Sequence, residues 1–333
     1  MIDAGLRVSD ISSIAHAWRP TATPAALRKR AGALRFTREF FHERGVLEVE
    51  TPAMVNAAVS DVNLGSVRAQ VAGFDAPLFL HTSPEYAMKR LLAAGSGDIY
   101  QVCHVYRGAE RGRQHNPEFT MLEWYRLGFS LQDLMAEVAA LVRGLLGVDL
   151  PVEMVAYRDA VLRHSGLDPL DATDAALRDA AMRLGMSVDH AHGAGRDELL
   201  DLIVGAQVGP ALGANSLTFV HRYPASQAAL ARLDPADARL ALRFELYRSG
   251  IELANGYHEL SDVAEQRRRF DADQEARRAR GLPVNSLDPH LLAALESGLP
   301  DCAGVALGFD RVLMLAMNAA SIDDVLAFPV ERA

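Results

Sequence analysis

The chain has 333 residues, of which 50% are hydrophobic and 23% are charged, as in globular proteins with a large core. Its formal net charge of −9 argues against bulk electrostatic binding of nucleic acid. The two cysteines, Cys103 and Cys302, are too few and too far apart for a disulfide framework or a metal motif. The N-terminus lacks the apolar segment of a signal peptide, and no apolar stretch reaches the roughly 20 residues of a membrane span. We therefore expect a cytoplasmic protein with no membrane partner.

The N-terminal part of the chain predicts an arm followed by alternating helices and strands. We interpret residues 1–25 as a loosely tied arm and residues 26–333 as one domain. Periodicity then predicts, in chain order, a helix over 25–44, a strand over 46–52, a hairpin within 62–82, a helix from 83 to about 94, and strands over 99–107 and 119–127 around the loop 108–117. The helix at 83 has Ser83 as its N-cap and Pro84 at its first position.

The second part of the chain continues this pattern after an amphipathic helix over 131–147. The predicted elements that follow are a helical insertion over 150–214, a strand over 217–224, a hairpin over 243–260 that turns at 248–250, a capped helix ending near 280, a strand near 304–307, and an apolar helix over 309–319. Strands joined by hairpins, with helices between them, favour an α+β fold on an antiparallel sheet over a βαβ nucleotide fold. Neither a P-loop nor a G-x-G-x-x-G motif occurs.

The loop between the strands 99–107 and 119–127 carries the first candidate site. Arg107 ends one strand, His115 and Asn116 lie in the loop, and Phe119 begins the return strand. The planar fork of an arginine suits phosphate oxygens, and an aromatic ring offers a stacking face for a purine. These residues could hold ATP without a P-loop, although a solvated, arginine-rich loop would have the same composition.

Three glutamates and a glycine–arginine pair form the other candidates. Glu245 and Glu252 flank the predicted turn, and two converging carboxylates indicate a Mg²⁺ site, or else two exposed edge-strand acids. Glu259, if buried, needs a cation that is either distant in sequence or part of a ligand. Gly308 allows close approach of a ligand, and Arg311 in the first turn of a helix hints at a phosphate, or else at an ion pair with a neighbouring aspartate.

The order of five segments resembles that of the class II aminoacyl-tRNA synthetases and their motifs 1, 2 and 3. The segments are GVLEVETP, TSPEYAMKRLL, HNPEFTMLEWYR, GIELANGYHEL and GVALGFDR. They are most similar to those of lysyl-tRNA synthetases, but only about 45 residues precede VLEVETP, too few for an anticodon-binding OB-fold. The chain therefore resembles the truncated paralogues of lysyl-tRNA synthetase that modify elongation factor P.

The resemblance implies a set of contacts for this sequence. The implied ATP contacts are Arg107, Gly108, Ala109, Glu110, His115, Asn116, Phe119, Glu252, Leu253, Gly308 and Arg311, with Arg107 and Arg311 as catalytic residues. The implied amino-acid contacts are Ser83, Pro84, Glu85, Tyr125, Asn255 and Glu259, and the implied Mg²⁺ ligands are Glu245 and Glu252. The family usually has glutamate where this chain has Ala109. Either Glu110 replaces that side chain through a shifted loop, or backbone groups hold the adenine.

The resemblance also implies an activity and a fold. The fold would be a six- or seven-stranded antiparallel sheet flanked by helices, in a homodimer formed through motif 1. The activity would be ATP-dependent and Mg²⁺-dependent activation of (R)-β-lysine, or of lysine, and transfer to a lysine ε-amine of elongation factor P. The implied source of β-lysine is a lysine 2,3-aminomutase. A minimal lysyl-tRNA synthetase and a non-catalytic regulatory paralogue are the alternatives, and the missing anticodon domain and the negative charge argue against a tRNA partner.

Overall fold

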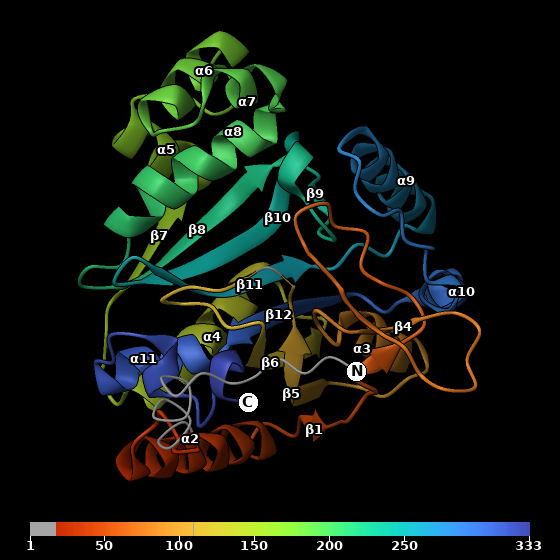
Figure 1. Ribbon diagram of the computed structural model, residues 1–333, viewed down its shortest axis with the longest axis vertical. Helices are drawn as coiled ribbons and strands as arrows, with labels where there is room; N and C mark the ends of the chain where they lie inside the picture. Colours follow the sequence, from red (N-terminus) through yellow and green to blue (C-terminus); the bar gives the residue numbers. More distant parts are fainter. Residues whose placement is uncertain (1–17, 109) are drawn as a thin grey trace, which may run out of the picture.

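The computed structural model describes residues 18–108 and 110–333, so most of the predicted N-terminal arm and Ala109 lie outside the described residues. Within those residues, nine strands form a central sheet and three short strands form a second sheet (Figure 1). The central sheet has the order β1-β5-β6-β12-β11-β10-β8-β7, and β9 pairs with β10. The short sheet has the order β2-β4-β3, and it contains the hairpin predicted within 62–82.

The strands of the central sheet are β1 (Leu47–Glu48), β5 (Ile99–Tyr106), β6 (Glu118–Leu127), β7 (Val152–Ala156), β8 (Leu217–Pro224), β9 (Leu233–Asp234), β10 (Asp237–Arg248), β11 (Ile251–His258) and β12 (Cys302–Gly308). Those of the short sheet are β2 (Met54–Val55), β3 (Val67–Ala69) and β4 (Leu78–Leu80). The helices are α2 (Pro24–His42), α3 (Glu85–Ala93), α4 (Leu131–Leu146), α5 (Tyr157–Ser165), α6 (Asp174–Arg183), α7 (Val188–Gly193), α8 (Arg196–Ile203), α9 (Val263–Ala279), α10 (Pro289–Gly298) and α11 (Phe309–Met317).

The central sheet is antiparallel in its interior and parallel at both edges. Neighbouring strands along the series β5-β6-β12-β11-β10-β8 pair antiparallel. At the two edges, β1 pairs parallel with β5, and β7 pairs parallel with β8. The expected sheet of six or seven antiparallel strands is therefore too small, because it omits these edge strands. The prediction that residues 152–156 belong to a helical insertion was wrong, since they form β7 beside β8. The helices that follow, α5–α8, lie at this end of the sheet (Figure 1).

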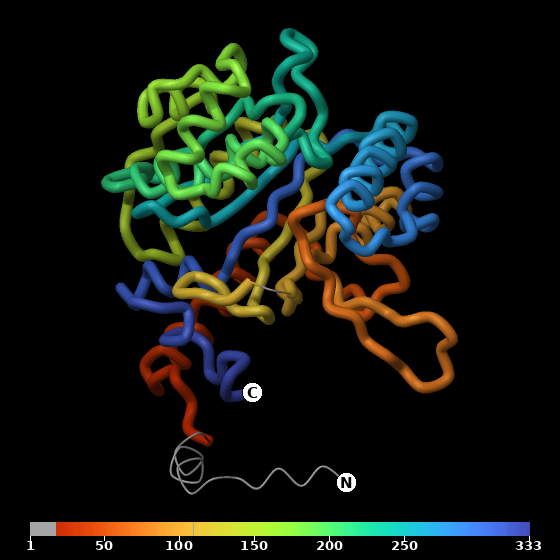
Figure 2. Tube along the Cα trace, turned by 45° about the horizontal axis from the view of Figure 1, so that its top comes forward, coloured from red at the N-terminus to blue at the C-terminus, as the bar shows by residue number. Residues whose placement is uncertain are grey.

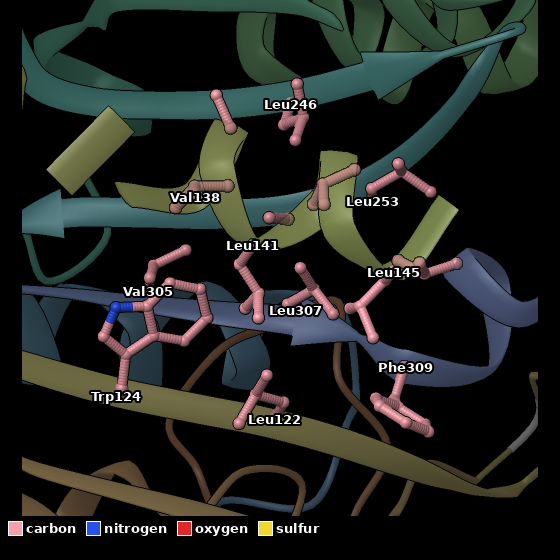
Figure 3. Packing of buried hydrophobic residues seen from close by; sticks show 14 of the residues in the cluster. Leu122, Trp124, Val138, Leu141, Leu145, Leu246, Leu253, Val305, Leu307 and Phe309 are labelled. Carbon is pink, nitrogen blue, oxygen red and sulfur yellow. The ribbon is translucent and has the colours of Figure 1, made fainter. Parts of the chain in front are cut away.

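Alternation along the strands separates a packed face from an open one. On the packed face, α2, α4 and α11 cover the sheet, and side chains of α4 meet those of β6 and β12 (Figure 3). The opposite face is covered at one end by α5 and at the other by α3 and α10, each with its own apolar cluster. Between these two clusters, the middle of the sheet remains uncovered by helices, and a cavity forms there.

Candidate active site

The alternation of side chains along β6 explains why this aromatic strand carries a buried glutamate, Glu123. Leu122 and Trp124 point into the packed core (Figure 3), and Glu123 between them lines the cavity on the other face. On that other face Met121, Glu123 and Tyr125 line a cavity of about 890 Å³. A strand with period 2 thus places its apolar residues in the core and its polar ones in a site.

The cavity brings together most of the residues singled out in the sequence. Those that line it are Ser83, Pro84, Glu85, Arg107, Glu110, His115, Asn116, Phe119, Tyr125, Glu252, Leu253, Asn255, Glu259, Gly308 and Arg311. Gly108 and Glu245 do not line it, and Ala109 lies outside the described residues. Gly108 instead donates its N–H to the carbonyl of Gly65 at 2.7 Å, and this bond holds the start of the loop against the segment before β3.

One end of the cavity is acidic, and a buried lysine, Lys89, lies behind its lining. The Nζ of Lys89 lies 2.7 Å from Oε1 of Glu85 and 2.6 Å from Oε2 of Glu259. The side chains of Lys89 and Glu259 are only 2% and 1% exposed. Burial alone would lower the pKa of Lys89, but Glu259 and Glu85 outweigh it and raise the pKa, so the lysine stays charged. The cation that Glu259 requires is therefore a residue distant in sequence.

Glu123 is the third carboxylate at this end, and the sequence analysis did not assign it to the site. Its two oxygens accept hydrogen bonds from the Ser83 hydroxyl at 2.6 Å and from the Tyr125 hydroxyl at 2.7 Å. Among the described residues, no lysine, arginine or histidine forms an ion pair with it. Burial, and then Glu85, raise the pKa of Glu123 to about 8. Burial also raises the pKa of Glu259, to about 7, against the opposing effect of Lys89. At this end the described residues thus place three carboxyl groups around a single ion-paired lysine, Lys89, so an ammonium ligand could meet a further carboxylate there.

Helix α3 positions two of these groups. It begins at Glu85, one residue later than predicted, with Pro84 at its N-cap position. The Ser83 oxygen accepts a hydrogen bond from the Glu85 N–H at 3.0 Å while its hydroxyl hydrogen bonds to Glu123. Lys89 is one turn along the helix from Glu85, which makes the first of its ion pairs an i,i+4 contact.

Small residues of β12 form the floor below these polar groups. Gly304, Ala306 and Gly308 line the cavity. A Cβ at Gly304 would lie 2.4 Å from the Tyr125 ring and 2.5 Å from Oε1 of Glu259. Any larger residue there would push both groups aside, so this glycine is needed for close approach.

The other end of the cavity is basic and aromatic. The guanidinium carbon of Arg107 lies 5.2 Å from the centre of the Phe119 ring. Within the described part of the chain, no acceptor bonds to the buried Nε of Arg107. An unused donor beside an aromatic face fits an anionic ligand with a planar base.

Arg311 joins this end to the loop before β6. Helix α11 begins one residue after Gly308, so Arg311 lies in its first turn, as predicted. Its Nη2 bonds to Nε2 of His115 at 2.6 Å, and its Nη1 donates to the carbonyl of Glu252 at 2.9 Å. Burial and then the positive charge of Arg311 lower the pKa of His115, so a neutral imidazole accepts this bond. The alternative ion pair with Asp310 does not form, because Asp310 pairs with Arg30.

The two predicted metal ligands lie near each other, but in different surroundings. The hairpin turns at Ser249 and Gly250 with φ of 51° and 73°. Burial and then Glu245 raise the pKa of Glu252, which faces the cavity. Glu245 accepts hydrogen bonds from Arg243 at 2.6 Å and Tyr247 at 2.7 Å. Each carboxylate oxygen retains a further lone pair, so the pair fits an oxygen-liganded cation such as Mg²⁺.

Comparison with known proteins identifies the family of this chain. The family of class II tRNA synthetases (D, K and N) matches residues 12–332. A protein of Pectobacterium carotovorum subsp. carotovorum (strain PC1), named elongation factor P–(R)-β-lysine ligase, is 50% identical over 320 residues, or 95% of this chain and 98% of the relative. A protein of the same name from Edwardsiella ictaluri (strain 93-146) is 49% identical over 330 residues, or 98% of this chain and 100% of the relative. The chain belongs to the elongation factor P–(R)-β-lysine ligase branch of the class II tRNA synthetases.

Membership of this ligase family agrees with the fold class and with the resemblance that the motif order indicated. It also makes the protein an enzyme of the ligase class. The described residues contain no helix that combines the length and the apolar character needed to cross a membrane. Sequence reasoning did not assign Glu123, which lines the cavity, or Lys89, which pairs with two of its carboxylates. The signal for Glu123 was its position two residues before Tyr125, on the same face of β6.

Proposed function

We propose that this protein activates (R)-β-lysine with ATP and transfers it to a lysine ε-amine of elongation factor P. The observation that carries the proposal is one cavity with an acidic end at Glu123 and Glu259 and a basic, aromatic end at Arg107 and Phe119. Phe119 and Tyr125 are six positions apart on β6, which corresponds to roughly 20 Å along an extended strand. A nucleotide and an amino acid laid end to end fit this span.

The acidic end would hold the amino groups of the donor. (R)-β-lysine carries two ammonium groups, whereas among the described residues Lys89 alone forms ion pairs at this end, with Glu85 and Glu259. Glu123 would be the main partner of the donor, because Glu259 and Glu85 already share Lys89. Tyr125 and Ser83 would orient Glu123 through their hydrogen bonds to its two oxygens. Asn255 of β11, which also lines the cavity, lies opposite Glu245 of β10. Glu123→Gln should weaken donor binding by about 2–5 kcal/mol, the usual cost of leaving a buried ammonium group without its charged partner.

The basic end would hold ATP so that the donor carboxylate faces the α-phosphorus. The carboxylate oxygen forms a bond to phosphorus as the bond to pyrophosphate breaks, which yields the acyl-adenylate. Arg107 would stabilise the charge that develops on the phosphate, Phe119 would stack on the adenine, and Arg311 and His115 would hold the distal phosphates. Mg²⁺ held by Glu252 and Glu245 would neutralise phosphate charge. No side chain is needed as a covalent nucleophile.

The second step transfers the acyl group to the acceptor. The neutral ε-amine of the acceptor lysine attacks the acyl carbon, AMP leaves, and the amine proton passes to solvent or to phosphate. The donor would come from a lysine 2,3-aminomutase, and the reaction would take place in the cytoplasm with the translation factor. We also propose a homodimer formed through motif 1, which the exposure of Leu47 and Met54 next to that motif supports.

The intact mass of elongation factor P tests this proposal directly. Purified, unmodified elongation factor P is incubated with the protein, ATP, Mg²⁺ and (R)-β-lysine, with lysine tRNA present as a competing acceptor. We expect a mass increase of one lysyl unit on the factor and none on the tRNA. Label on the tRNA alone would make the protein a minimal synthetase. Absence of both label and ATP–pyrophosphate exchange would make it a binding-only paralogue.

Matched variants connect this assay to the cavity. Glu123→Gln keeps the shape of the side chain and removes the negative charge that faces the donor, so we expect loss of pyrophosphate exchange. Asp149→Asn removes a carboxylate whose side chain is 93% exposed and whose ion-pair partner in the described part of the chain is Arg143, so exchange should stay at the level of the unaltered protein. Equal activity in both variants would contradict the assignment of the acidic end to the donor.

A further inference from the structure

The loop that carries the ATP-side residues is fastened to the C-terminal segment. This loop, residues 110–117, follows Arg107 and includes His115 and Asn116. Figure 2 shows it in yellow beside the blue C-terminal part of the chain. Residues 321–332, which we call the C-terminal clamp, contain the short 3₁₀ turns Ile322–Asp324 and Val330–Arg332.

One arginine of the loop holds both turns of the clamp. The Arg111 guanidinium bonds to both oxygens of Glu331, at 2.5 and 2.8 Å, and to Oδ2 of Asp323 at 2.9 Å. The same guanidinium donates to the carbonyls of Gly112 and His115, at 3.3 and 3.2 Å. It therefore joins the clamp to the tight turn of the loop, in which Gly112 and His115 exchange backbone hydrogen bonds at 3.1 Å.

Two further contacts are independent of that ion pair. The Asn116 side chain is buried, and its Oδ1 accepts from the N–H of Val330 at 3.1 Å while its Nδ2 donates to the carbonyl of Glu118 at 2.6 Å. The N–H of Ile322 donates to the carbonyl of Arg113 at 2.9 Å. The amide oxygen of Asn116 thus attaches the loop to the clamp, while its amide nitrogen fixes the side chain against the start of β6.

The clamp acts on the site through His115. Its carbonyl is held by Arg111, and its ring accepts the hydrogen bond from Arg311. We propose that the C-terminal clamp positions the ATP-side loop, with Arg111, Asp323 and Glu331 as positioning residues that set the orientation of His115 and Arg311 for ATP. This inference rests on the proposed function for the meaning of the site, but the contacts themselves do not depend on it.

The size of the effect follows from the exposure of the pair. The side chains of Arg111 and Glu331 are 33% and 55% exposed, and ion pairs at such sites contribute little to global stability. Their loss should loosen the loop and leave the fold intact. We expect the KM for ATP to rise by about threefold to tenfold in the double variant Asp323→Asn/Glu331→Gln, with little change in the KM for the donor or in the melting temperature.

The test combines kinetics with hydrogen–deuterium exchange. ATP–pyrophosphate exchange is measured at saturating (R)-β-lysine for the unaltered protein, the double variant, Arg111→Gln, the conservative variant Glu331→Asp and the control Asp149→Asn. Amide exchange of residues 110–117 is measured without substrates. In the double variant and in Arg111→Gln we expect faster amide exchange of this loop and a higher KM for ATP. Glu331→Asp should give intermediate values, and the control should match the unaltered protein.

Two results would overturn the inference. The first is that both clamp variants match the unaltered protein in the amide exchange of residues 110–117 and in the KM for ATP. The other is an equal rise of both KM values together with a lower melting temperature, which would indicate a general structural role. If the unaltered protein shows no pyrophosphate exchange, the proposed function fails, and the amide exchange of the loop still tests the clamp on its own.

Discussion

Replacement of Lys89 by methionine tests the electrostatics of the acidic end. Methionine fills most of the volume of the lysine stem, so the change mainly removes the buried charge. Glu85 and Glu259 would then face each other and Glu123 without a cation. Breaking a buried pair by removing one partner usually costs about 3–5 kcal/mol. With an unfolding entropy of roughly 2.1 cal/mol/K per residue over 333 residues, this loss lowers Tm by about 4–7 °C.

The pH dependence of the stability loss in Lys89→Met distinguishes the removal of a charge from a change in packing. Without Lys89, the pKa of Glu259 in the folded state rises further above its unfolded value. A carboxyl group with a raised pKa destabilises the fold once the pH exceeds its unfolded pKa, and the penalty falls as the pH is lowered and the folded state takes up the proton. The difference in Tm between Lys89→Met and the unaltered protein should therefore be larger at about pH 8 than at about pH 5.5.

Thermal unfolding followed by circular dichroism at both pH values supplies the measurement. Lys29→Met is the control, because Lys29 is exposed on α2 and forms no ion pair within the described chain. The control should change Tm little at either pH. A loss of less than about 1 kcal/mol for Lys89→Met at the higher pH, or a loss that does not depend on pH, would refute the reasoning.

Three further predictions concern the cavity itself. Gly304→Ala places a Cβ against the Tyr125 ring and should abolish donor-dependent pyrophosphate exchange, whereas Gly32→Ala, which meets no atom within 4 Å, should leave exchange unchanged. Donor affinity, measured by calorimetry, should fall about tenfold per pH unit below the pKa of Glu123, near 8, because an ammonium group binds the ionised form; a flat profile would contradict this. Arg107→Lys loses the fork and its position over the ring, so kcat for adenylate formation should fall by roughly a hundredfold; retained activity would remove Arg107 from the phosphate.

Local sequence signals predicted much of the fold because they reflect short-range physics. The turn at 248–250 was predicted, and the structure has left-handed backbone at Ser249 and Gly250. A cap for the helix that ends near 280 was predicted, and Asp262 caps α9; the start of α11 after Gly308 was also predicted and confirmed. Strand β7 was missed because its residues are exposed and lack alternation, and it is a strand only through its pairing with β8.

By itself, the sequence determined the family, the order of motifs and a set of candidate residues most of which line the cavity, since these depend on residue types at short spacings. Only the tertiary structure decided which charges meet. Lys89 and Glu259 are far apart along the chain, as are Arg111 and Glu331, and each pair forms because the packing of α3, β11 and the C-terminus brings its members within hydrogen-bond distance. Coulomb energy and desolvation depend on distance and burial in space, and spacing along a chain specifies neither.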